Sequence, residues 1–128
     1  MNVVLFASGK NVAVSKRLQK VTESKVPLKH LETIQTIEDL SKRVRRLPRE
    51  IDVAVLLAQS NDQLSEFFPL KEFLEDVRII LILPNLERET ITKGHLLRPR
   101  YIDYVDGDFS NVGTVLEKMF NYMKDNQI

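Results

Sequence analysis

The sequence contains no cysteine, and only two of its 128 residues are histidine. The absence of cysteine excludes disulfide bonds, zinc–thiolate centres and a cysteine nucleophile, and it is compatible with a reducing compartment. Two histidines without a cysteine also argue against a zinc site. Four glycines and five prolines are too few for a fibrous or disordered chain. We therefore expect a globular protein.

An excess of one charge is also lacking, because 19 basic and 18 acidic residues leave a net charge of +1. Such a chain has no global field that would attract nucleic acid or an anionic membrane, and neither is expected as a partner. The apolar run Val3–Ala7 near the N-terminus is followed at once by polar residues. It is too short for a signal peptide or a membrane span, so we expect a cytoplasmic protein.

The length of 128 residues suits a single domain that covers residues 1–128. A chain of this size buries about two-thirds of the surface that its unfolded form exposes, so it needs no second core. No internal repeat, linker or low-complexity segment marks a domain boundary.

Short apolar segments predict five β-strands. The segment Ile51–Ala58 is apolar without alternation after its one aspartate, which is the pattern of a central strand buried on both faces. A second segment, Leu28–Glu32, is partly polar, as in an edge strand, and there the side chain of His30 is expected to be solvated. The other three predicted strands are Val3–Ala7, Ile79–Leu83 and Tyr101–Val105.

Apolar residues spaced three and four apart predict helices between these strands. Thr36 and Ser60 are expected N-caps, and Gln63 gives the second one the spacing of a capping box. Pro69 is expected to break a helix near Phe68. The predicted helical segments are 11–23, 36–47, 61–68, 70–74, 87–98 and 112–123. The buried face of the second segment is expected to consist of Ile37, Leu40, Val44 and Leu47.

Strands that alternate with helices over short connections require a parallel sheet with right-handed crossovers and helices on both faces. We therefore predict an α/β three-layer sandwich, a doubly wound five-stranded parallel sheet with the flavodoxin-like strand order 2-1-3-4-5. Such folds bind their ligands beyond the carboxyl ends of the strands.

A family resemblance enters at the predicted fifth strand. Residues 103–109 read D-Y-V-D-G-D-F, and this stretch resembles the D-Y-L-x-K-P-F that receiver domains of two-component response regulators commonly carry there. The order and lengths of the elements resemble a receiver over the whole chain. The resemblance implies a receiver-like fold and a role in signal transduction.

The resemblance also assigns the functional positions of a receiver. The two acids that bind magnesium in a receiver fall on Ala7 and Ser8, and its phosphate-accepting aspartate falls on Leu57 or Ala58. Its hydroxyl residue falls on Pro84, and its lysine falls on Gly107. Aspartyl phosphorylation needs a carboxylate nucleophile and a divalent cation held by oxygen ligands, which these residues do not supply. We expect a pseudo-receiver that works without phosphorylation, has no metal or cofactor, and is not an enzyme.

The leading functional hypothesis is a module that binds another protein. Receivers generally pair through their fourth helix, fifth strand and fifth helix, so this face is expected to bind the partner and to support a homodimer. Aromatic residues and arginine dominate the energetics of interfaces. The face would present His95, Arg98, Arg100, Tyr101 and Tyr104.

The alternative hypothesis is a domain that binds a small ligand such as a nucleotide at the carboxyl mouth of the sheet. Polar, mostly uncharged side chains there could orient such a ligand. The candidate residues are Ser8, Gln59, Ser60, Asn85 and Asp106.

Two charged clusters admit a structural and a functional interpretation. Asp103, Asp106 and Asp108 could hold a cation, but turn and helix-cap chemistry is favoured for Asp106-Gly107 and Asp108. The basic run Lys42–Arg49 is interpreted as a solvated helix face, with a docking surface as the alternative. It has no interleaved aromatic residues for stacking on bases.

Overall fold

The structure is a computed structural model that describes residues 1–125, so the last three residues of the expected domain lie outside the described residues. One parallel sheet runs through it in the order β2-β1-β3-β4-β5. This confirms the predicted fold class. The strands are β1 Val3–Phe6, β2 Leu31–Ile34, β3 Val53–Leu57, β4 Arg78–Leu83 and β5 Tyr101–Tyr104.

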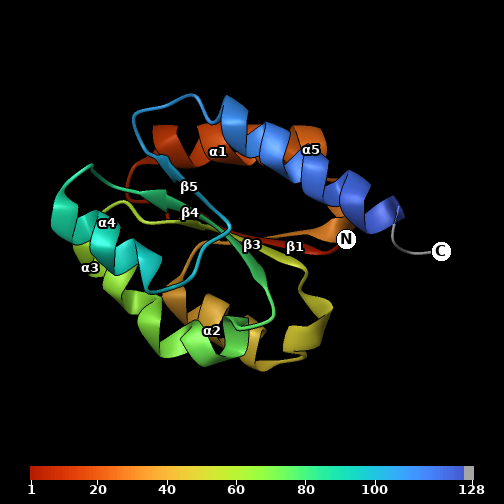
Figure 1. Cartoon of the computed structure of the whole chain (residues 1–128), viewed down its shortest axis with the longest axis horizontal. Helices are drawn as coiled ribbons and strands as arrows, with labels where there is room; N and C mark the ends of the chain where they lie inside the picture. The colour runs from red at the N-terminus through yellow and green to blue at the C-terminus, as the bar shows by residue number, and fades with distance from the viewer. Residues whose placement is uncertain (126–128) are drawn as a thin grey trace.

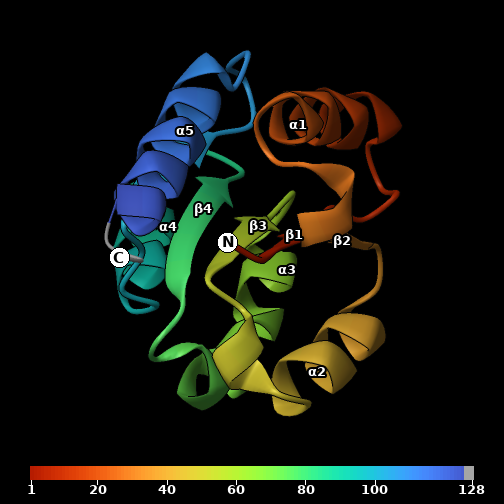
Figure 2. The same ribbon diagram turned by 90° about the vertical axis from the view of Figure 1, so that its right-hand side faces the viewer.

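Helices cover both faces of the sheet, which gives three layers (Figures 1 and 2). Helices α1 and α5 pack together on one face, and α2, α3 and α4 lie on the other. The α-helices are α1 Val12–Lys25, α2 Ile37–Arg45, α3 Asn61–Glu66, α4 Arg88–His95 and α5 Ser110–Asp125. Three 3₁₀ segments are η1 Leu28–His30, η2 Pro48–Glu50 and η3 Phe68–Leu74.

The central strand β3 separates two hydrophobic cores. Its side chains alternate, so Ala54 and Leu56 pack towards α2, α3 and η3, whereas Val55 and Leu57 pack towards α1 and α5. Every residue of β3 is at most 1% exposed. The unbroken apolar pattern of this segment therefore reports burial on both faces, as predicted.

The second strand begins later than predicted. Instead of Leu28–Glu32, the strand is Leu31–Ile34, and residues 28–30 form the 3₁₀ turn η1. Pro27 has a φ of −57°, and its carbonyl accepts a hydrogen bond from the His30 amide at 2.8 Å, which closes the turn. The edge position of the strand is confirmed.

The buried face predicted for α2 extends one residue too far. Thr36 caps the helix, since its Oγ1 accepts a hydrogen bond from the Asp39 amide at 3.1 Å, but the helix ends at Arg45. Leu47 is 59% exposed and has a φ of 51°. Arg46, the C-cap, is already extended, and proline disfavours the helical conformation in the residue before it, so Leu47 does not continue the helix.

The break at Pro69 is confirmed, because α3 ends at Glu66 and the next segment, η3, is a 3₁₀ helix. Helix α4 is shorter than predicted and ends at His95. Within it, Gly94 lies directly over β4, where an added Cβ would be 3.0 Å from a methyl carbon of Leu83. Glycine at this position lets the helix approach the sheet closely.

Candidate functional site

The structure brings the ends of β1 and β3 together at the carboxyl edge of the sheet. Phe6 pairs with Leu56, so Ala7 and Ser8 lie beside Leu57 and Ala58. The amides of Ala7 and Ala58 continue the ladder, with hydrogen bonds to the carbonyls of Ile34 (3.0 Å) and Ile82 (2.9 Å). Leu57 and Ala58 are fully buried. Their side chains therefore belong to the two cores.

A network of neutral polar side chains joins these strand ends to α1 and α3. We call Ser8, Ser15, Gln59 and Gln63 the switch-point network. Gln63 Nε2 donates to Ser8 Oγ at 2.9 Å, and Gln59 Nε2 donates to Ser15 Oγ at 3.0 Å and to the Ser8 carbonyl at 3.3 Å. Ser15 Oγ also donates to the Ser8 carbonyl. The network thus uses its hydrogen bonds to tie β1 to α1, β3 and α3.

Two members of this network, Ser15 and Gln63, were not among the predicted site residues. The Ser60 cap is confirmed, because Ser60 Oγ accepts a hydrogen bond from the Gln63 amide at 3.1 Å. The Gln63 side chain does not return to the Ser60 amide as in a capping box. Its Oε1 accepts from the Gln59 amide at 2.8 Å instead, which leaves its Nε2 free to reach Ser8. The capping-box spacing was thus the sequence signal for Gln63, although it gave the wrong partner.

The other two receiver positions, Pro84 and Gly107, follow β4 and β5. The amide of Gly107 donates to the Tyr104 carbonyl at 3.2 Å and closes the turn after β5. A cation from α1, Arg17, contacts the segment after β5. Arg17 Nη2 donates to the Val105 carbonyl at 2.7 Å, and its guanidinium lies 5.1 Å from the centre of the Phe109 ring. Arg17 is therefore partly buried.

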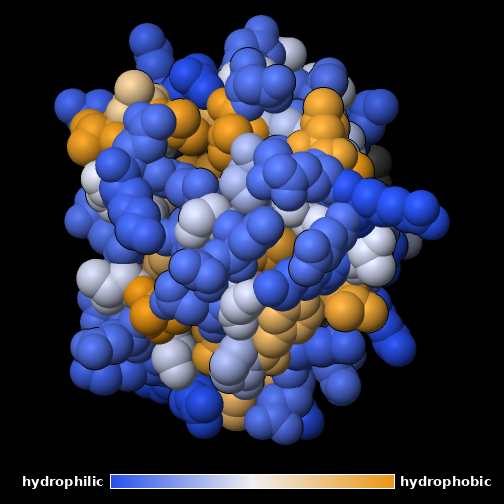
Figure 3. Space-filling model, turned by 90° about the vertical axis from the view of Figure 1, so that its left-hand side faces the viewer, coloured by the Kyte–Doolittle hydropathy of each residue, from blue (hydrophilic) through white to orange (hydrophobic). Residues whose placement is uncertain are grey.

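The residues predicted to form a ligand mouth are brought together only in part. Ser8 and Gln59 are directly hydrogen-bonded. Ser60 caps α3, and Asn85 Oδ1 accepts a hydrogen bond from the Glu87 amide at 3.0 Å ahead of α4. Asp106 is exposed. The surface at the carboxyl ends of the strands is mostly hydrophilic, and its hydrophobic residues form several separate patches (Figure 3).

The five residues of the predicted interaction face fall into two groups. His95, Arg98 and Arg100 are exposed. Tyr101 packs against the core under α1 and α5, whereas Tyr104 packs against the core under α2, α3 and α4. Residues three apart on a strand point to opposite faces, so the two rings lie on opposite sides of the edge strand β5.

Two groups near β5 have shifted pKa values. Burial raises the pKa of Tyr101, and the nearby charge of Asp103 raises it further. The pKa of Asp108 is lowered chiefly by a hydrogen bond from the Ser110 amide to its Oδ1, at 2.9 Å. Asp108 thus has the structural role that turn and cap chemistry predicts. Within residues 1–125, no three histidine, aspartate or glutamate side chains are grouped so that they could hold a metal ion.

The basic run Lys42–Arg49 is not a uniformly solvated face. Arg43 is only 9% exposed, and its Nε lies 2.6 Å from Glu32 Oε2 on β2. The guanidinium of Arg45 lies 4.7 Å from the centre of the Phe73 ring on η3. The interpretation as a solvated face was therefore wrong for Arg43, which connects α2 to the edge of the sheet.

These features define a class of protein: a doubly wound α/β domain with the flavodoxin-like, receiver-type strand order. No helix in the part of the chain described is both long enough and apolar enough to cross a bilayer.

Solved structures that are similar to this chain include the following two. One is a protein from Burkholderia pseudomallei described as pilus assembly-related, with a TM-score of 0.62 and 12% identity over 95% of this chain and 88% of that one. The other is the phosphorylated cyanobacterial phytochrome response regulator RcpA, with a TM-score of 0.62 and 11% identity over 94% of this chain and 92% of that one. No protein-family model matches the sequence, and no curated protein matches it. The likenesses show a receiver-like fold.

Proposed function

We propose that the chain is a pseudo-receiver: a signalling or regulatory module of a two-component-like system that binds another protein without being phosphorylated. The observation that supports this most is the switch-point network. Neutral side chains hydrogen-bond to one another at the strand ends where a phosphorylated receiver needs carboxylates around a cation.

The chemistry of phosphoryl transfer supports the proposal further. A phosphoryl acceptor must present a nucleophilic oxygen, and the negative charge of the transferred group must be balanced by a metal ion or a fixed cation. Leu57 and Ala58 have no such oxygen and are fully buried. The Ser8 hydroxyl already accepts a hydrogen bond from Gln63. In this proposal the module has no catalytic residue, and its output is a surface of fixed shape.

The proposed contact surface for a different protein is the face formed by α4, β5 and α5, with β5 at the edge of the sheet. An edge strand presents unpaired backbone groups that another chain can use. The exposed residues His95, Arg98 and Arg100 lie in the chain between the end of α4 and the start of β5, and arginine is a frequent anchor of interfaces. The structural likeness to a response regulator and to a pilus assembly-related protein favours a regulatory role over an enzymatic one.

The experiment uses beryllofluoride, which mimics a phosphoryl group on aspartate, together with Mg²⁺. Thermal unfolding of the chain is followed with and without the mixture, and a receiver with an intact acidic site serves as the positive control. The expected result is an unchanged melting temperature for this chain and a raised one for the control, since a ligand that binds the folded state stabilises it. A saturable rise for this chain contradicts the proposal.

A second candidate function, binding of a small ligand at the mouth, is favoured by one observation. Gln59 Oε1 is buried and accepts no hydrogen bond among the described residues, so it could accept one from a ligand. A thermal-shift series with nucleotides and flavins tests this candidate. Ligand at about 100 times its Kd stabilises a protein by roughly 2.7 kcal/mol, which such a series detects readily. A shift that is lost in Gln59→Leu would favour this function.

A further inference from the structure

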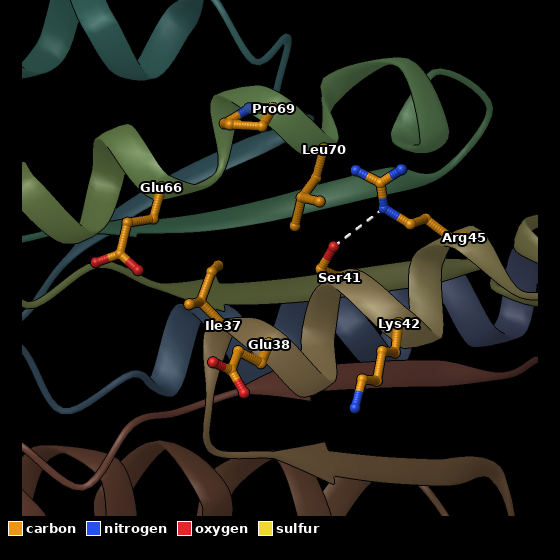
Figure 4. A pocket seen from close by; sticks show the side chains of 8 residues that line it. All are labelled: Ile37, Glu38, Ser41, Lys42, Arg45, Glu66, Pro69 and Leu70. Carbon is orange, nitrogen blue, oxygen red and sulfur yellow. Dashed lines mark hydrogen bonds between the residues drawn. The ribbon is translucent and has the colours of Figure 1, made fainter.

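A groove of about 490 Å³ lies between α2 and the segment formed by α3 and η3 (Figure 4). We call it the α2–η3 groove. The groove is separate from the switch-point network, because none of the residues that line it belongs to that network. Its lining residues are Ile37, Glu38, Ser41, Lys42, Arg45, Glu66, Pro69 and Leu70.

The middle of the groove is apolar. The side chains of Ile37 from α2 and Leu70 from η3 extend into the space between the two segments (Figure 4). Leu70 is 2% exposed and forms the floor, whereas Ile37 is half-buried and Pro69 is exposed. A partner that fills this space therefore removes apolar surface from water, which favours binding.

The ends of the groove have opposite charges. Glu38 and Glu66 lie at one end, and Arg45 lies at the other (Figure 4). Arg45 is held in place by Ser41 Oγ, which accepts a hydrogen bond from its Nε at 3.1 Å, and by the Phe73 ring. In the described part of the chain, neither glutamate takes part in an ion pair. Both acids are thus available to a partner.

Three of the charged residues of α2 line the groove from one face of the helix: Glu38 in its first turn, and Lys42 and Arg45 in its last. Glu38, Ser41 and Arg45 are spaced three and four apart, so they form one stripe on this face. The acidic end and the basic end of this stripe are about 10 Å apart at 1.5 Å of rise per residue. Two such stripes placed antiparallel bring each glutamate opposite the arginine of the other copy. The partner whose charges fit this groove is therefore a second α2.

We propose that the α2–η3 groove binds a second copy of this chain in a two-fold symmetric dimer. Each α2 lies in the groove of the other protomer, with Glu38 of one protomer opposite Arg45 of its partner. The small side chain of Ser41 stands at the centre, where the two helices approach, and beside it the exposed Lys42 of each protomer extends towards solvent. A two-fold axis makes the contact isologous, so it closes at two copies and does not extend into a filament. This inference rests on the proposed function, since it names one partner of the interaction module.

The dimer is expected to be weak and sensitive to salt. Ion pairs at an exposed rim are screened within about 10 Å at 0.1 M salt, and stable interfaces usually bury at least about 1,200 Å² in total. One groove with a few rim charges is at the low end of this range, so we expect a dissociation constant in the micromolar range or above, on the order of 1–100 μM.

Charge reversal at both ends of the stripe tests the proposal. Sedimentation velocity at low salt is measured over a concentration series for the original chain, for Glu38→Arg and for Arg45→Glu. Each single variant places two like-charged pairs across the interface, so each is expected to dissociate at least about tenfold more readily. An equal mixture of the two variants restores both opposite-charge pairs and is expected to form dimers again. Only a contact between these two positions predicts this rescue.

Two controls separate this contact from the alternatives. Lys118→Glu and Arg100→Glu reverse exposed charges near β5, and both are expected to leave the dimer intact. Circular dichroism and thermal unfolding of every variant confirm that it is folded. A monomer at all concentrations, loss of the dimer only in the β5 variants, or failure of the mixture to rescue each overturns the proposal. None of these results bears on the beryllofluoride experiment, so the two proposals fail separately.

Discussion

The switch-point network and the α2–η3 groove differ in where their polar groups find partners. In the network, buried amides and hydroxyls of Ser8, Ser15, Gln59 and Gln63 bind one another, and none of the four is charged. In the groove, Glu38 and Glu66 are charged and exposed, and neither has an ion-pair partner among the described residues. Apart from Gln59 Oε1, the polar side-chain atoms of the network are paired within the chain, whereas the groove leaves charges for another molecule.

The difference shows where binding energy is available in this fold. A buried polar group that loses its partner costs about 1–3 kcal/mol, so the network stabilises the native state and resists a ligand that would replace its hydrogen bonds. Exposed charges contribute little to folding and can be used in association. Substitutions in the network should therefore change stability, and those in the groove should change association.

The largest effect is expected from a carboxylate at the receiver acceptor position. Leu57→Asp places an acid among the apolar side chains under α1 and α5, and an uncompensated buried charge costs roughly 3–5 kcal/mol or more. Burial raises the pKa of such a carboxyl above its unfolded value, so the loss of stability should shrink as the pH falls towards 4 and the group is protonated. Urea denaturation measures both effects.

The control for this variant is Leu57→Asn, whose penalty should not depend on pH. An Asp variant as stable as the original chain, and stabilised further by Mg²⁺, would mean that position 57 opens to the mouth and not to the core.

A smaller effect is expected from the network itself. Gln63→Leu removes the partners of Ser8 Oγ and of the Gln59 amide, and the loss of stability should be about 1–3 kcal/mol. Gln35→Leu, at an exposed position, is the matched control and should change stability by less than about 0.5 kcal/mol. Equal effects of the two substitutions in chemical denaturation would show that the network has no special role.

Arg17 connects α1 to the turn after β5, and its loss should cost less. Arg17→Met keeps the apolar stem but removes the hydrogen bond to Val105 and the contact with Phe109, for an expected loss of roughly 1 kcal/mol. Lys16→Met, at the exposed neighbouring position, should be nearly neutral. Amide hydrogen exchange in residues 105–109 should accelerate only in the Arg17 variant; unchanged protection there would count against this role.

The smallest effect on stability is expected in the groove. Arg45→Gln loses an exposed hydrogen bond to Ser41 and a cation–π contact, together worth about 0.5–1 kcal/mol. Thermal unfolding at a concentration where the chain is monomeric isolates this effect from dimerisation. A loss as large as that of Gln63→Leu would mean that the groove belongs to the core and would remove the contrast between the two regions.

The sequence predicts the fold well because the signals for it are local and strong. The unalternated apolar residues of β3 and the period of the helices require a parallel sheet with two covered faces, and the structure has this arrangement. The boundaries are predicted less well, because proline acts on its neighbours. Pro27 precedes a 3₁₀ turn that delays β2, and Pro48 keeps Leu47 from continuing α2, which ends at Arg45.

The candidate site is predicted less completely than the fold. Ser8 and Gln59 follow strands, so their place at the carboxyl edge could be inferred from the strand order. Gln63 joins the network because its Oε1 accepts a hydrogen bond from the Gln59 amide and not from the Ser60 amide. Which of these two amides it accepts from is decided by the tertiary structure. Arg17 contacts a turn 88 residues away in the chain, and no local pattern indicates such a contact.

Intact-protein mass spectrometry decides whether the mouth of the sheet is a phosphorylation site. The chain is incubated with acetyl phosphate and Mg²⁺ beside a receiver that has its acidic site. Because this chain has no carboxylate at Leu57 or Ala58, only the receiver is expected to gain the mass of one phosphoryl group. A phosphoryl group on this chain that is released by hydroxylamine, as acyl phosphates are, would contradict this expectation.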